Sequence, residues 1–490
     1  MMKIPDKVAT KVWRKPVLVG GVGLSLALWT WQSWQHTLGD LGGLTMGGMV
    51  IAYGGYRWFK RQNPIAQTPV PQAPIDSVKA LQEMALRNTQ AIAKTQNLLQ
   101  QLQTENIDPA HNPSITDLET RLQELIPASD RSSLSLLVTG GKGVGKTTLL
   151  EVFSPNTAKP LTFTETPSLF SLDSPSLDLE QILNYDLVLF LTIGDLTDSE
   201  FQTLAPLAQQ QRTILIFNKQ DQHDPLTIAK ILAQLQQRVA GLLPQIPVVG
   251  ISVAPRSIKV IQAQVGGEAQ TWLESPEPYL TALTTQVQTI INQESQQLVL
   301  ATTFRQIQSL HGHVRAKLYM VRSDRSQPVI EQYQWVAAAT AFANPVPMLD
   351  LLATGAINTQ LIMDLGAIYQ QKISLAQAEN TVGILASLLV KLGLVEFSTQ
   401  AIGHFLKSNV VTYVAGGFLQ GASAAYLTRV SGLSLIAYFQ ESSEQEITEF
   451  KGDRLQEIIQ KIYRQNQLPV LQSLIQQATQ KLRVPQDNPV

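Results

Sequence analysis

The chain has 490 residues, a formal net charge of −1 and no cysteine. This length predicts two or three domains. The near-neutral charge gives no indication of nucleic-acid binding, and the lack of cysteine excludes disulfides and thiolate metal sites. Charged residues make up 15% of the chain, against about 25% in an average soluble protein, which indicates that part of the chain avoids water.

The N-terminal segment, residues 1–61, is predicted to be a transmembrane hairpin. Residues 16–39 and 41–56 carry no formal charge, and the first run reaches the length of about 20 mostly apolar residues that spans a bilayer. Basic residues precede the first run and follow the second, which predicts that both ends lie in the cytoplasm. A signal peptide is the alternative, but no small-residue cleavage site follows the first run.

Two segments of different character come next. Residues 62–75 contain four prolines, which cannot continue a helix and therefore predict an extended linker. Residues 76–130 are rich in glutamine and carry a helical apolar stripe, so they predict a helical stalk. The stripe is interpreted as a packing face rather than a coiled coil because its heptads are irregular.

A glycine-rich motif follows an apolar strand in LSLLVTGGKGVGKTTLL, residues 134–150. The pattern GxxxxGK[ST] is complete, and its glycines let backbone N–H groups converge on phosphate oxygens. Lys146 is expected to reach the β/γ-phosphates, and the Thr147 hydroxyl is expected to bind Mg²⁺. Lys142 lies inside the turn, and a phosphate contact and a solvent position both stay open for it. The predicted phosphate site comprises Gly140, Gly141, Lys142, Gly143, Val144, Gly145, Lys146, Thr147 and Thr148.

A second motif bears on the choice of base. The apolar strand TILIF ends in Asn218-Lys219-Gln220-Asp221, which resembles the NKxD box of GTPases. The resemblance implies that Asp221 accepts two hydrogen bonds from guanine, Lys219 packs over the base and Asn218 braces the loop. Adenine cannot donate this pair of hydrogen bonds, and a site built around such bonds rejects the wrong partner by roughly 10⁴ or more. GTP or GDP is therefore the expected nucleotide.

The remaining GTPase motifs are weaker. Ser252-Val253-Ala254 follows a predicted strand where the family usually has SAK, which implies a backbone contact to the guanine O6. LFSLDSPSL, residues 169–177, resembles the DxPG box and gives Asp173 as a ligand of Mg²⁺ through water. Ser176 replaces the glycine of that box, so hydrolysis is expected to be slow.

The expected metal site consists of Thr147 and Asp173, together with Thr157 as the switch threonine and Thr162 in reserve. The catalytic residues are expected to be Lys146, Thr147 and Asp173.

Residues 131–258 alternate predicted strands and helices, which indicates a doubly wound α/β domain. The strands are expected at LSLLVT, LTFTET, LFSLD, DLVLFLTI, TILIF and IPVVGIS. Together with the motifs above, this order resembles an Era-like P-loop GTPase domain.

The C-terminal half is predicted to be mainly α-helical. Residues 276–440 contain NPVPMLDLLA and MDLGAIYQ, which resemble the domain of unknown function in YcjF-like membrane proteins. In cyanobacterial-type proteins of this kind, that domain follows an Era-like GTPase domain. A helical bundle that packs at the membrane is preferred over helices that span it, because the apolar runs are interrupted. Residues 441–490 predict an amphipathic helical tail.

These observations predict a membrane-anchored GTP-binding protein with slow Mg²⁺-dependent hydrolysis of GTP, acting as a switch or in membrane remodelling. The GTPase domain is expected on the cytoplasmic side. Expected partners are a lipid membrane and either a second copy of the chain or a partner helix, but no nucleic acid. Two alternatives stay open: a nucleotide-binding scaffold or tether without hydrolysis, and an ATPase of the MinD type.

Overall fold

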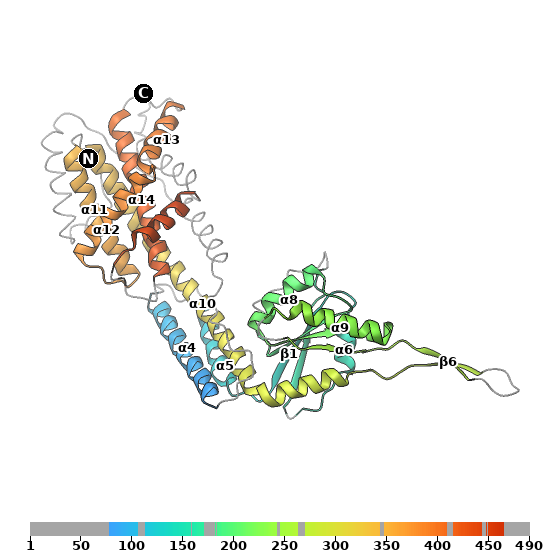
Figure 1. The fold of residues 1–490 in the computed structure, drawn as a ribbon. Helices are drawn as coiled ribbons and strands as arrows, with labels where there is room; N and C mark the ends of the chain where they lie inside the picture. Colours follow the sequence, from blue (N-terminus) through green and yellow to red (C-terminus); the bar gives the residue numbers. More distant parts are fainter. Residues whose placement is uncertain are drawn as a thin grey trace, which may run out of the picture. The chain divides into compact units, whose positions relative to one another are not determined.

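A computed structural model describes the central and C-terminal parts of the chain, and Figure 1 shows its fold. The predicted transmembrane hairpin at 1–61 and the linker at 62–75 lie outside the described residues, as does the end of the tail, 465–490. The described residues form two compact units, which divide between Lys317 and Leu318. The structure describes residues 78–105, 113–157, 159–170, 182, 184–242, 246–262, 270–343, 347–408, 415–442, 447 and 449–464.

The first unit is built around a parallel five-stranded sheet with the strand order β2-β1-β3-β4-β5. All residues of β3 and β4 are buried, as expected for parallel strands that have helices on both faces. The predicted α/β fold is therefore confirmed at the level of a parallel α/β sheet. The strands are β1 (Leu134–Gly140), β2 (Leu161–Glu165), β3 (Leu187–Thr192), β4 (Thr213–Phe217) and β5 (Val248–Gly250).

One expected strand is absent from the described part of this sheet. Leu169 and Phe170 form a turn after β2, so the prediction of a strand that begins there is wrong. The backbone N–H of Leu169 donates to the carbonyl of Gly140 at 3.1 Å, and this contact turns the chain across the end of β1. Asp173, in the second half of the expected strand, lies outside the described residues.

Two apolar cores cover the two faces of the sheet. Because successive side chains of a strand point to opposite faces, Leu136 of β1 lies in one core and Leu137 in the other. The Leu136 core includes α6 and the first part of α10, and the Leu137 core includes α8 and α9. These helices are α6 (Lys146–Val152), α8 (Asp198–Gln210), α9 (Pro225–Val239) and α10 (Thr281–Ala343).

The predicted stalk forms two helices, α4 (Val78–Glu105) and α5 (Pro113–Ala128). Met84 of α4 packs against Leu300 and Ala301 of α10. The buried Asn88 side chain donates from Nδ2 to the backbone carbonyl of Leu300 at 3.0 Å. The stalk is thus attached to the first part of α10.

Helix α10 belongs to both units. The helical domain was predicted to begin at Pro276, but the apolar residues of α10 from Leu283 to Val299 pack on the sheet. The second unit begins at Leu318, inside the same helix.

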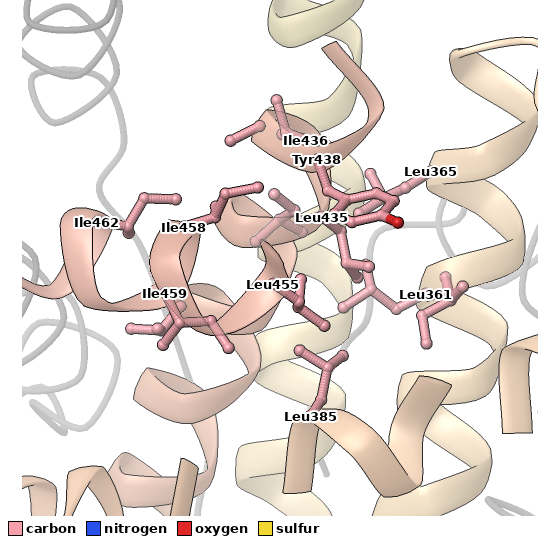
Figure 2. Packing of buried hydrophobic residues seen from close by; sticks show 14 of the residues in the cluster. Leu361, Leu365, Leu385, Leu435, Ile436, Tyr438, Leu455, Ile458, Ile459 and Ile462 are labelled. Carbon is pink, nitrogen blue, oxygen red and sulfur yellow. The ribbon is translucent and has the colours of Figure 1, made fainter. Parts of the chain in front are cut away.

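The second unit is a helical bundle. Its core joins α10 to α11, α12, α13 and α14, and residues 452–464 add a further helix. Leu455, Ile458, Ile459 and Ile462 of this last helix belong to the same core as Leu361 of α11, and Figure 2 shows Leu455 above Leu385 of α12, on the side toward Leu361. The described part of the predicted tail therefore packs into the bundle. The helices are α11 (Pro347–Ile368), α12 (Leu375–Lys391), α13 (Leu394–Ser408) and α14 (Ala415–Glu441).

The length and hydropathy of the bundle helices bear on whether they could span a membrane. Within the described residues, none of the helices is by itself both long and apolar enough to cross a bilayer. Helix α12 and residues 394–403 of α13 are long and apolar enough only when they are taken together, and the chain bends by 61° at the break between them.

The bundle gives a stability prediction at Gly432 of α14. A Cβ added there would lie 2.8 Å from Cγ1 of the buried Ile330 on α10. Gly432→Ala is expected to lower the free energy of unfolding by about 1–3 kcal/mol, because Ile330 is stiff and enclosed. Urea denaturation of the full chain measures this change. Gly383→Ala in α12 is the control, since a Cβ there meets nothing within 4 Å. An equal response of both variants would contradict the close approach.

Candidate functional site

The glycine-rich loop connects β1 to α6 at the carboxyl end of the sheet, where open α/β sheets bind ligands. Gly143 and Gly145 have φ angles of 74° and 95°, in the left-handed region that favours glycine. A Cβ on Gly145 would also lie 2.4 Å from Nδ2 of Asn218. Glycine at 145 is therefore required both by the backbone and by a neighbouring side chain. Lys142 is exposed and Thr148 is half-buried.

Lys146 lies along this loop and is buried. Its Nζ donates to the carbonyl oxygens of Gly140 and Gly141 at 3.2 and 3.0 Å. Burial lowers the pKa of the Lys146 ammonium, and the nearby Glu165 carboxylate partly offsets this effect. An anion bound in the loop would stabilise the charged ammonium in the same way as Glu165 does.

Thr147 contacts Glu165, an acidic residue that was not among the predicted site residues. Its hydroxyl donates to both carboxylate oxygens of Glu165, at 3.0 and 2.9 Å. Glu165 ends β2, which pairs in parallel with β1, so both strands deliver their last residues to the same edge. A hydroxyl and a carboxylate are the oxygen ligands that Mg²⁺ prefers.

A signal for Glu165 was present in the sequence. Glu165-Thr166-Pro167-Ser168 has the acidic-x-Pro spacing of the DxPG box and begins at the last residue of β2. The hydroxyl of Thr166 donates to that of the buried Thr139 on β1 at 2.8 Å, which holds this turn against the sheet. The sequence alone does not decide between this match and the one at Asp173, which lies outside the described residues.

The two threonines proposed for the switch lie elsewhere. Thr162 pairs with Ser135 near the start of β1, at the opposite end from the loop. The hydroxyl of Thr157 donates to the carbonyl of Lys159, just before Pro160, whose carbonyl accepts from the N–H of Leu134. These contacts place both residues beside the start of β1.

Asn218 joins three segments of the site. Its Nδ2 donates to the carbonyl of Val144 in the glycine-rich loop at 2.8 Å. Its Oδ1 accepts from the backbone N–H groups of Lys219 and Val253, at 2.8 and 3.2 Å. The residue is 2% exposed. The structure thus brings together the glycine-rich loop, the Asn218–Asp221 segment and the Ser252–Ala254 segment.

Asp221 is exposed beside this junction. Its Oδ1 accepts from the Ser252 hydroxyl at 2.9 Å, and its Oδ2 accepts from the backbone N–H of Arg256 at 3.1 Å. An ionised carboxylate has about four acceptor positions, so capacity for two further donors remains. Lys219, at φ 62°, turns the chain between Asn218 and Asp221. Ala254 is exposed.

The described residues contain no group of three or more His, Cys, Asp or Glu side chains that could hold a metal ion. Mg²⁺ is commonly bound by one or two protein carboxylates together with water and substrate phosphates. The Thr147–Glu165 pair fits such a shared site.

The helical half of the chain is similar to a known protein family. Residues 305–468 match a family described as a domain of unknown function, DUF697. The match begins within α10 and takes in the bundle, in agreement with the expected helical domain of unknown function, and it includes no strand of the sheet. No curated protein matches the chain.

Proposed function

We propose that the sheet domain is an Era-like P-loop GTPase domain that binds GTP or GDP with Mg²⁺. The observation that carries this proposal is the Asn218 side chain, which ties the glycine-rich loop to the segment that ends in Asp221. A triphosphate in the loop would then have its base beside a carboxylate with free acceptor positions. Guanine offers the matching pair of donors, and adenine does not.

The proposed roles follow from the contacts. Lys146, now bonded to loop carbonyls, would turn to the β/γ-phosphates. Thr147 would bind Mg²⁺ directly, and Glu165 would hold the Thr147 hydroxyl or a water of the metal. Asp173 stays a second candidate for that role. Since no residue that orients the attacking water has been identified, we propose slow hydrolysis of GTP.

We further propose that residues 1–61 anchor the chain in a membrane and that the nucleotide domain lies on the cytoplasmic side. The support is the charge pattern of the N-terminal runs. The helical half would associate with the membrane or with a partner and respond to the nucleotide state.

Nucleotide preference in the full-length protein tests the proposal. Asp221→Asn is expected to weaken GTP binding by at least about a hundredfold, because the guanine donors lose a charged acceptor. The variant is expected to gain affinity for xanthosine triphosphate, whose base carries a carbonyl where guanine carries an amino group. Competition against a fluorescent guanine nucleotide measures both changes.

Asp224→Asn is the matched control for this variant. Asp224 is the N-cap of α9 and accepts from the N–H groups of Leu226 and Thr227. Asparagine caps helices as well as aspartate does, so nucleotide binding should not change. ATP that competes as well as GTP would contradict the guanine site and favour an ATPase of the MinD type. Binding without phosphate release, with or without liposomes, would favour the scaffold.

A further inference from the structure

A two-stranded arm leaves the sheet domain after the Ser252–Ala254 segment and returns just before α10 (Figure 1). Its strands, β6 (Ile258–Gln262) and β7 (Gln270–Glu274), pair with each other in antiparallel register. At the base of the arm, the backbones of Ser252 and Tyr279 exchange two hydrogen bonds, at 3.0 and 2.8 Å. The arm therefore returns the chain to the candidate site and fixes Tyr279 beside it.

Tyr279 shares a face with the side chain that holds Asp221. In an antiparallel pair, residues directly opposite each other point to the same face, with Cβ atoms about 4.5–5.5 Å apart. Tyr279 lies directly opposite Ser252, whose hydroxyl donates to Oδ1 of Asp221 at 2.9 Å and accepts from the Asp221 backbone N–H at 3.0 Å. Aromatic side chains reach neighbours about 7–8 Å away on such a face. A base bound at Asp221 would therefore lie within reach of the Tyr279 ring.

The Tyr279 ring lies outside the apolar packing of the sheet domain. Its neighbour Leu280 packs against the Leu136 core, but neither core described for the sheet includes Tyr279. The residue is 50% exposed. The ring thus keeps area free for a ligand, and a nucleic-acid base of any kind has a flat face that stacks on an aromatic side chain.

We propose that Tyr279 stacks on the purine base of the bound nucleotide, an inference that rests on the proposed nucleotide site. Asp221 would accept hydrogen bonds from the edge of guanine, and Tyr279 would cover one face of the ring system. Stacking adds affinity without selecting among bases, because every base has such a face. The two residues therefore have separable roles: Asp221 determines which purine is preferred, and Tyr279 increases the affinity for any purine.

Competition against a fluorescent guanine nucleotide, with the full-length protein, tests this role. Tyr279→Ala is expected to weaken the binding of both GTP and GDP by about 5- to 150-fold, the range for loss of one base–aromatic stack. The preference for GTP over ATP is expected to stay unchanged. Tyr279→Phe is expected to bind within about twofold of the wild type, because phenylalanine offers the same ring for stacking.

Trp272→Ala is the matched control, because it truncates another exposed aromatic side chain, on β7, and should not change nucleotide binding. Circular dichroism checks that each variant is folded. A weaker preference for GTP over ATP in Tyr279→Ala would overturn the proposal, since Tyr279 would then only support Ser252 and Asp221. Wild-type affinity in Tyr279→Ala would overturn it as well, and so would a Tyr279→Phe variant as weak as Tyr279→Ala.

The proposed guanine site fails on a different result. If the wild type binds ATP as well as GTP, the guanine preference is wrong, but an equal loss of both nucleotides in Tyr279→Ala still supports stacking. If the wild type prefers GTP and Tyr279→Ala binds it equally well, the guanine site stands and the stacking role is wrong. A wild type that binds no nucleotide would overturn both.

Discussion

Glu294→Gln is expected to lower the free energy of unfolding by about 3–5 kcal/mol, the range for breaking a buried ion pair. Glu294 of α10 forms a bidentate pair with Arg212 at the start of β4, with N–O distances of 2.9 and 3.0 Å. The side chains are 2% and 10% exposed, respectively. The neutral amide would leave the guanidinium buried without its counter-charge. Chemical denaturation of the full chain, followed by circular dichroism, measures the loss.

A double replacement distinguishes the cost of leaving one buried charge unpaired from the cost of changing the two side chains. Arg212→Met with Glu294→Leu removes both charges and keeps an apolar volume, so most of the lost stability should return. A loss of less than about 1 kcal/mol in Glu294→Gln, the range of exposed pairs, would mean that water screens this contact. The pair matters because it attaches α10 to the sheet, and the same helix continues into the bundle.

The sequence predicted the structure best where a short run of residues determines it. The apolar runs at β1, β3 and β4 predicted buried strands, because a parallel strand covered on both faces is apolar throughout. The glycine-rich loop and the Asn218–Asp221 segment could be expected at one edge, since each follows a strand of the same parallel sheet.

Features that depend on neighbours in space could not be predicted in this way. The contact between Glu165 and Thr147 depends on β2 lying beside β1, and the sequence does not specify strand order. The division of α10 between two units depends on what each part of one continuous helix packs against. The β6–β7 arm fell between the predicted domains, because its short apolar strands mix with charged residues as a loop does.

Asn218→Ala is expected to lower the free energy of unfolding by about 2–6 kcal/mol. The change leaves the carbonyl of Val144 and the N–H of Val253 without their bonds, and a buried polar group without a partner costs about 1–3 kcal/mol. It also detaches the glycine-rich loop from the Asp221 segment, so nucleotide binding should be lost as well. Denaturation with and without nucleotide measures the two effects separately.

A double-mutant cycle tests whether Asn218 acts through Gly145. Gly145→Ala puts a methyl group 2.4 Å from Nδ2 of Asn218 and strains a backbone at φ 95°. Gly143→Ala supplies the matched control, because its φ is 74° and a Cβ there meets nothing within 4 Å. Gly145→Ala should therefore cost more than Gly143→Ala in the wild type, and about the same once Asn218 is alanine. The expected coupling is about 0.5–3 kcal/mol. Additive losses would show that the loop and the Asn218 side chain are independent, and the physical link on which the proposed nucleotide site depends would then be absent.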